Sequence, residues 1–177
     1  LLGMKVVLTA FDVATGWIVV RWLAARGAPP SAAAWYFLNP LVLKEVANSA
    51  HIDIVSVFFA TAALFWMSHY TKPLRAWLLL ALSVGTKLYA VALAPLFARA
   101  DERWPRHALL GAGTLAGLYL PFAGAGTQLF AGTAAYGEIW IFNASLFRAI
   151  AAAWATILPD SSWAPRITVM LLFVAIV

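Results

Sequence analysis

The residues best suited to chemistry lie in one short stretch of the sequence, directly after Asn39-Pro40. They are Lys44, Glu45, Asn48, His51 and Asp53. A helix that continues past Pro40 places Lys44, Asn48 and His51 on one stripe and turns Glu45 about 100° away from Lys44. The His51-Ile52-Asp53 turn then presents an imidazole and a carboxylate, which can move a proton, orient a sugar hydroxyl or bind a divalent cation.

Each of these residues also has a simpler explanation. Asp53 would suit the N-cap of the next helix, where the helix dipole favours an anion. His51 would suit an interfacial loop. Because both residues lie close to Glu45 and Lys44, we favour a functional group over separate structural roles.

Three further charges lie within apolar segments, where a charge is costly and is therefore a candidate for function. Lys87, at the start of a helix, would form an anion site suited to phosphate, although a lysine that extends toward the interface is the simpler alternative. Lys5 and Asp12 lie seven residues apart on one helix face, so we expect a structural pair that lowers the cost of both charges. Lys5 would also be able to reach a phosphate.

A later polar stretch combines aromatic, amide and carboxylate side chains. Its members are Tyr136, Glu138, Trp140 and Asn143. A ring face stacks on the apolar face of a pyranose, so this set suits sugar binding, and an interfacial aromatic anchor is the alternative. The chain contains no cysteine, which excludes disulfides and thiolate metal sites. No nucleotide-binding, zinc-protease or serine-hydrolase motif occurs, so we expect no resident metal and leave a divalent cation open as a cofactor.

Composition indicates that these residues belong to a membrane protein. Of the 177 residues, 64% are hydrophobic and only 11% are charged, whereas a soluble domain is roughly 45–50% apolar and about 25% charged. We therefore predict an all-α, polytopic transmembrane helical bundle. The net charge of +5 comes from Lys and Arg at the ends of apolar runs. That distribution is typical of cytoplasmic loops, so we expect a lipid bilayer and no nucleic acid as partner.

The predicted spans are 1–23, 32–48, 53–68, a short hairpin over 74–98, 107–120 and 163–177, with an outer loop over 123–160 whose expected helix is 144–157. The hairpin decides the topology, because basic residues flank it on both sides. These are Lys72, Arg75, Arg99, Arg103 and Arg106. Two short arms, with Gly85 ending the first and Thr86 capping the second, keep both flanks in the cytoplasm. A single kinked helix remains the alternative, and it would invert every later segment.

The stretch from Trp35 to Asp53 resembles a motif of the polytopic glycosyltransferases of the C superfamily, most closely the bacterial polyprenyl-phosphate-mannose-dependent mannosyltransferases. In those proteins an Asn-Pro, a Glu and a His-x-Asp turn lie at similar spacing, often with Gly where this chain has Ala50. Gly85-Thr86-Lys87, followed by Pro95, resembles their lipid-phosphate-binding hairpin. Leu120-Pro121-Phe122, followed by Trp140 and Asn143, also fits, and the resemblance extends from Leu1 to about Phe147.

The resemblance implies inverting transfer of a sugar, with mannose expected, from a polyprenyl-phosphate donor to a glycan or glycolipid acceptor. The implied place is the outer face of a bacterial plasma membrane. The implied roles are catalysis for His51, Asp53 and Glu45, donor-phosphate binding for Lys87 and Lys5, and sugar binding for Trp140, Asn143 and Asn48. The family's acidic base lies in a first outer loop. Because the chain starts without Met and ends in an apolar run, we expect a fragment that lacks this base and is inactive alone.

Two other functions stay open. A secondary transporter would use intramembrane charges such as Lys5, Asp12, Lys44 and Glu45, near the midplane and between inverted repeats. No repeat is evident in the sequence. A non-catalytic membrane assembly subunit is the third possibility.

Overall fold

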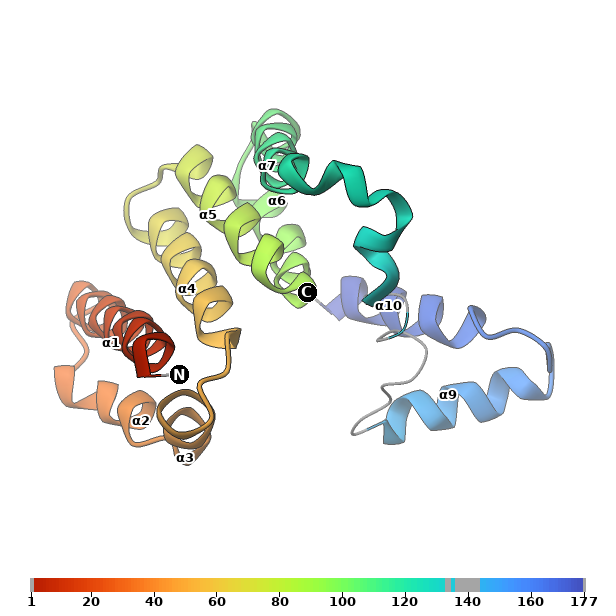
Figure 1. The fold of residues 1–177 in the computed structure, drawn as a ribbon, viewed down its shortest axis with the longest axis horizontal. Coiled ribbons are helices and arrows are strands. Elements are labelled where there is room, and N and C mark those ends of the chain that lie inside the picture. The colour runs from red at the N-terminus through yellow and green to blue at the C-terminus, as the bar shows by residue number, and fades with distance from the viewer. Residues whose placement is uncertain (1, 133–134, 136–143, 177) are drawn as a thin grey trace. The chain divides into compact units, whose positions relative to one another are not determined.

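The computed structural model describes residues 2–132, 135 and 144–176, and it is all-helical over this part of the chain (Figure 1). The predicted all-α class is therefore confirmed. The chain divides into two compact units, Leu1–Leu120 and Pro121–Val177. Every residue of the predicted catalytic group lies in the first unit.

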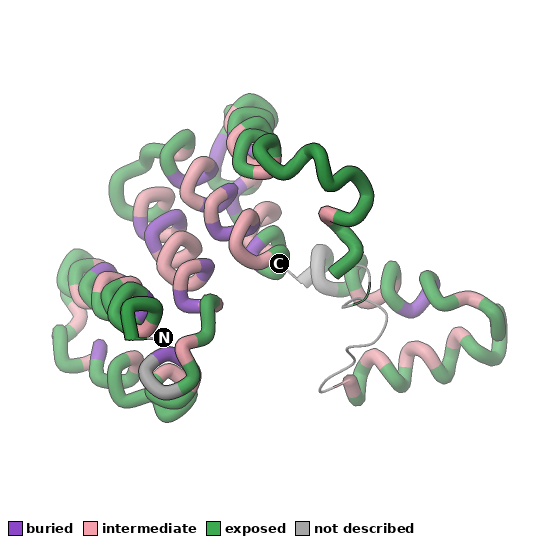
Figure 2. The backbone as a smooth tube through the Cα atoms, viewed as in Figure 1, coloured by how far each residue is buried: buried purple, intermediate pink, exposed green. Residues whose placement is uncertain are grey.

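Four longer helices form the first unit, and they pack in chain order (Figure 1). They are α1 (Leu2–Ala25), α4 (Asp53–His69), α5 (Pro73–Thr86) and α7 (Trp104–Tyr119). Shorter elements join them: η1 (Pro30–Ala33), α2 (Ala34–Phe37), α3 (Pro40–Val42), the π-helix η2 (Leu43–Asn48), η3 (Leu88–Leu93) and α6 (Ala94–Ala100). Helix α4 packs between α1 and α5, and α5 packs on α7, so α4 and α5 supply much of the buried core (Figure 2).

The second unit contains two α-helices among its described residues, α9 (Ser145–Ala155) and α10 (Ala164–Ile176). Trp154 Nε1 donates a hydrogen bond to Thr168 Oγ1 at 2.9 Å and so joins them. Helix α9 falls where a helix was predicted inside the loop over 123–160. The segment η4 (Leu120–Phe130) leads into this unit and changes direction at Gly126, whose φ of 54° favours glycine.

The chain reverses direction at Lys87, between α5 and η3. The ring of Trp77, near the start of α5, packs edge-on against Phe97 of α6, with 5.6 Å between ring centres. Phe97 is only 1% exposed and belongs to the same core cluster as Leu80 and Val84 of α5. These contacts require the arm after Lys87 to run back along α5.

Two details of the predicted hairpin are wrong. Thr86 does not cap the second arm: it is the last residue of α5, and its hydroxyl donates to the carbonyl of Leu82 at 3.0 Å. Gly85 lies within α5 rather than after it, and a Cβ there would approach Leu115 and Leu118 of α7 to 3.2 and 3.1 Å. The glycine therefore serves close packing between α5 and α7.

The segment predicted as a span over 32–48 is not one continuous helix. Helix α2 ends at Phe37, and α3 begins at Pro40. The side chain of Asn39 accepts a hydrogen bond from the N–H of Leu41 at 2.9 Å, and Pro40 occupies the first helical position. A capping Asn followed by Pro is a strong signal for a helix start, and this explains the break.

Two helical segments of the described chain are long and apolar enough to cross a bilayer, namely Leu2–Ala25 and Trp104–Phe130. The second comprises α7 and the η4 segment that follows it. Large apolar side chains of α1 are exposed, including Val6, Val13 and Trp17, each at least 56%. The other predicted spans correspond to shorter elements.

Candidate functional site

Five ionisable side chains form a continuous series of ion pairs beside the start of α4 and the end of α5. We call this set the ionic cluster: Lys44, Glu45, His51, Asp53 and Lys87. The two oxygens of Glu45 lie 3.3 Å from Lys44 Nζ and 3.2 Å from His51 Nε2. His51 Nδ1 lies 3.7 Å from Asp53 Oδ2, and Asp53 Oδ1 lies 3.3 Å from Lys87 Nζ. Cations and anions therefore alternate along the cluster when His51 is protonated.

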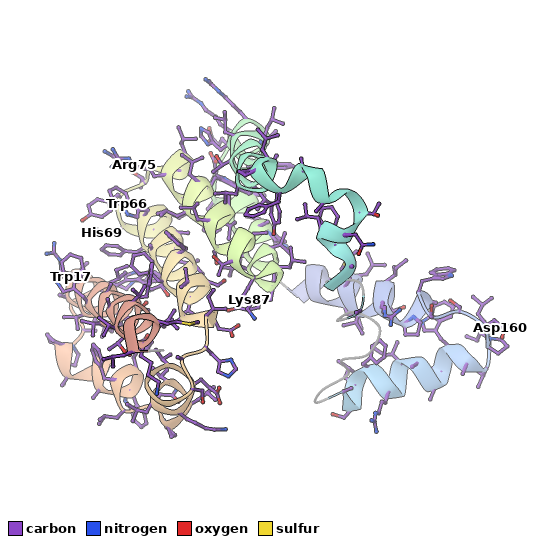
Figure 3. All side chains as sticks on the ribbon, viewed as in Figure 1. Trp17, Trp66, His69, Arg75, Lys87 and Asp160 are labelled. Atoms are coloured by element: carbon purple, nitrogen blue, oxygen red, sulfur yellow. The ribbon has the colours of Figure 1, made fainter. Side chains whose placement is uncertain are left out.

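Lys87 lies where α5 ends, and its backbone is extended, with φ −150° and ψ 122°. Figure 3 shows it at the opposite end of α5 from Arg75. The sequence singled out Lys87 and Asp53 separately, and the antiparallel packing of α4 on α5 brings them together. The element after Lys87 is a 3-10 helix of 6 residues, so the ammonium itself, rather than a helix dipole, would attract an anion here.

The π-helix η2 places Glu45 against both of its partners. Its wider turn changes the angles between successive side chains, and Glu45 faces Lys44, contrary to the prediction from α-helical geometry. Beyond η2, the N–H of His51 donates to the carbonyl of Glu45 at 2.9 Å. Backbone and side chain of His51 are thus both joined to Glu45.

Ala50 occupies the position immediately before His51 and has φ of 55°, in the left-handed region. A glycine adopts this conformation without the cost that a Cβ imposes, about 1–2 kcal/mol. The chain therefore adopts a glycine-like turn at the position where the resembling family often has Gly.

Replacing Ala50 with glycine is expected to raise the thermal stability of the protein, by about 0.5–1 kcal/mol, because relief at positive φ outweighs the added freedom of the unfolded chain. The midpoint of thermal unfolding, followed by tryptophan fluorescence, measures this. Ala14→Gly is the matched control: Ala14 is also partly buried but lies within α1, so the same exchange should lower stability by a similar amount. A loss of stability in Ala50→Gly would contradict the assignment of strain to this turn.

Asp53 does not cap helix α4. It is the first residue of α4, the capping position belongs to Ile52, and no side-chain capping hydrogen bond forms there. Its two oxygens face His51 and Lys87 instead. The structure thus removes the simpler explanation for this carboxylate.

Asp12 does not pair with Lys5. Tyr36 of α2 donates its hydroxyl to Asp12 Oδ1 at 2.6 Å, which joins α1 to α2. Lys5 nevertheless lies one turn before Leu8, and Leu8 packs with Val46 of η2 and Ile54 of α4. The N-terminal end of α1 therefore lies beside the elements that carry the ionic cluster.

Four residues predicted for sugar binding, Tyr136, Glu138, Trp140 and Asn143, lie outside the described residues, as does the side chain of Asn48. No group of three or more His, Asp or Glu in the described part of the chain could hold a metal ion.

The ionic cluster is accessible rather than buried. Its side chains are between 31% and 71% exposed, with Lys87 at 39% and Asp53 at 41%. Ion pairs this exposed contribute little to stability, about 0–1 kcal/mol each. Stability alone therefore does not account for five converging charges, and a ligand can reach them.

The opposite end of the helices carries arginine side chains stacked on tryptophan rings. Arg21 lies 5.3 Å from the centre of Trp17, Arg26 lies 5.3 Å from Trp22, and Arg75 lies 4.9 Å from Trp66. Helices α1 and α4 run parallel, because Leu8 packs with Ile54 while Trp22 packs against Phe65. The stacks therefore lie one helix length from the ionic cluster, about 25 Å for the 17 residues of α4.

A second buried polar group at this end escaped the sequence analysis. Asp101, 6% exposed, accepts hydrogen bonds from Trp77 Nε1 at 3.0 Å and from the N–H of Arg103 at 3.0 Å, and it lies 2.7 Å from His107 Nδ1. Burial raises the pKa of Asp101, but the hydrogen bonds from His107, Arg103 and Trp77 outweigh it and lower the pKa below its usual value. Asp101 thus joins α5 to the start of α7.

Because the folded-state pKa of Asp101 is lowered, its stabilisation should be complete above the unfolded pKa of about 3.9 and should vanish as the pH falls through the folded value. We expect Asp101→Asn to cost about 1.5–3 kcal/mol at neutral pH. The difference from the parent should narrow below about pH 4. Thermal unfolding across a pH series measures it, with the exposed neighbour Glu102→Gln as control. A difference that stays constant into acid would contradict the charged hydrogen-bonding role.

Comparison with family models, with curated proteins and with solved structures gives no match to this chain. Functional inference therefore rests on the site itself.

Proposed function

We propose that this chain belongs to a membrane glycosyltransferase, which moves a sugar from a polyprenyl-phosphate donor to a glycan or glycolipid acceptor outside the cytoplasm. Mannose is the expected sugar. The observation that carries the proposal is the convergence of Lys87, Asp53 and His51 in one accessible cluster.

Lys87 suits the donor phosphate. Its ammonium is half-exposed and adjoins a single carboxylate oxygen, that of Asp53, at 3.3 Å. A phosphate oxygen can form the same charge-assisted hydrogen bond. When the bond between the sugar and the phosphate breaks, negative charge builds up on the leaving phosphate, and a cation held there lowers the barrier.

His51 suits the acceptor side of the reaction. One ring nitrogen can accept the proton of an acceptor hydroxyl while its oxygen attacks the anomeric carbon and the bond to the phosphate breaks. The resulting imidazolium would lie between the carboxylates of Glu45 and Asp53, which stabilise its charge. This assigns the proton to His51 and the departing phosphate to Lys87.

The distribution of charges along the helices supports an outward-facing site. The arginine–tryptophan stacks suit a cytoplasmic interface, where basic residues concentrate and aromatic rings lie at the headgroup level. The ionic cluster then lies at the other interface, within reach of a lipid-linked donor. We propose a multi-pass protein of a bacterial plasma membrane. The same placement weighs against a transporter, whose coupling charges belong near the midplane.

A transfer assay tests this function directly. Membranes from cells expressing the full-length protein would receive farnesyl-phosphoryl-mannose carrying radiolabelled mannose, and label in membrane glycans and glycolipids would be counted. We expect transfer by the parent and its loss in His51→Ala and Lys87→Met at equal insertion. Failure of the parent with mannosyl, glucosyl and galactosyl donors, or sugar uptake without covalent transfer, would refute the proposal.

A further inference from the structure

Two serines join α4 to α5 in the buried core of the first unit. Ser56 and Ser83 are both 0% exposed. Ser83 Oγ donates to the carbonyl of Ser56 at 2.8 Å, Ser56 Oγ donates to the carbonyl of Ser83 at 3.1 Å, and the two hydroxyl oxygens are 2.9 Å apart. The bonds are thus reciprocal, and each helix holds the backbone of the other.

The serine pair lies one turn from both ends of the Asp53–Lys87 ion pair. Ser56 follows Asp53 by three residues on α4, and Lys87 follows Ser83 by four, so each serine shares a helix face with its neighbour in the ion pair. The link on α5 is also direct: the carbonyl of Ser83 accepts from the N–H of Lys87 at 2.9 Å and from the hydroxyl of Ser56. One oxygen therefore joins the backbone of Lys87 to helix α4.

We propose that Ser56 and Ser83 are positioning residues, which fix the end of α5 on α4 so that the ammonium of Lys87 meets Asp53. Without such a tie the last turn of a helix frays, because its final carbonyls lack partners within the helix. Lys87 is already in extended backbone, beyond the last turn. A half-exposed ion pair between flexible side chains is too weak to order this segment.

The contacts farther along the same interface use a different chemistry. Ala63 of α4 and Ala76 of α5 are both 0% exposed and belong to the apolar core cluster. Close packing of small side chains suffices to hold the helices together there. Buried hydroxyls restrict register and rotation more than apolar contacts do, since an unmade hydrogen bond in the core is costly. The polar pair thus lies where the geometry of a charged side chain depends on it.

Spin labels on either side of the ion pair test this positioning. Ile52 and Leu88 are 49% and 51% exposed and flank Asp53 and Lys87, and the chain contains no native cysteine. Pulsed electron resonance on Ile52→Cys/Leu88→Cys should give a narrow distance distribution. Adding Ser56→Ala/Ser83→Ala should broaden it toward longer distances. The double alanine should still fold, because both serine carbonyls keep their helical partners, and Ser56→Ala alone is the milder second variant.

The matched control is Ala63→Gly/Ala76→Gly, which loosens the same helix pair at its other end and should leave the label distribution narrow. A distribution unchanged in the serine variants, or broadened equally in the control, would overturn the proposal. A second readout rests on the proposed function: the serine variants should bind farnesyl phosphate about fivefold more weakly. If the labels respond but the parent never binds farnesyl phosphate, the positioning role stands and the proposed function fails.

Discussion

Replacing Lys87 with methionine is expected to lower sugar transfer by about 100-fold or more, because the departing phosphate loses the cation that stabilises its growing charge. Methionine keeps most of the apolar stem. The Asp53 carboxylate left behind is 41% exposed, so water can solvate it and the fold should be kept. Initial rates with farnesyl-phosphoryl-mannose, normalised to inserted protein, measure the effect. Lys87→Arg should recover part of the rate, since a guanidinium also binds phosphate.

Lys44→Met is the matched control for this experiment. It removes the same charge from the same ionic cluster, but Lys44 is 71% exposed and contacts Glu45 at the far end of the series. We expect its rate to stay within about threefold of the parent, as for an exposed ion pair. Equal losses in both variants would mean that the cluster acts only through its total charge, and an unaffected Lys87→Met would remove Lys87 from the mechanism.

The sequence revealed the site because charges stand out in an apolar chain. In a chain with only 11% charged residues, Glu45, His51, Asp53 and Lys87 could each be selected as costly groups that need a reason. The fold-back between α5 and α6 could also be anticipated, since basic residues flank both sides of the segment. What could not be read from the sequence was the contact between Asp53 and Lys87, because it depends on how α4 and α5 pack.

The missed features depend on tertiary packing rather than on composition. Ser56 and Ser83 look neutral within apolar helices, and only their position between α4 and α5 turns them into a reciprocal pair. Tyr36 was expected to be unremarkable, yet it replaces Lys5 as the partner of Asp12. The π-helix η2 has no distinctive periodicity, so α-helical angles gave the wrong orientation for Glu45. Asp101 did carry a local signal, an Asp just before a helix start, which the surrounding arginines obscured.

Asp53→Asn is expected to shift binding and transfer in opposite directions. In the unliganded protein Asp53 already occupies the ammonium of Lys87, at 3.3 Å, so a lipid phosphate must displace this carboxylate before it binds. Asparagine is nearly isosteric and uncharged, and it removes the competitor. Farnesyl phosphate should therefore bind about fivefold more tightly, the equivalent of one exposed ion pair. Microscale thermophoresis of the labelled protein in detergent measures the affinity, with farnesol as the ligand that lacks the phosphate.

Transfer by the same variant should fall by about 10- to 100-fold, because His51 loses one of the two carboxylates that stabilise its protonated form. Tighter binding with slower chemistry is the signature of a group that opposes the ground state and favours the transition state. Loss of the ion pair through simple unfolding would weaken both quantities together, and a passive surface charge would change neither. Weaker farnesyl phosphate binding in Asp53→Asn would contradict competition for Lys87. It would instead mean that Asp53 orients the lysine toward the phosphate.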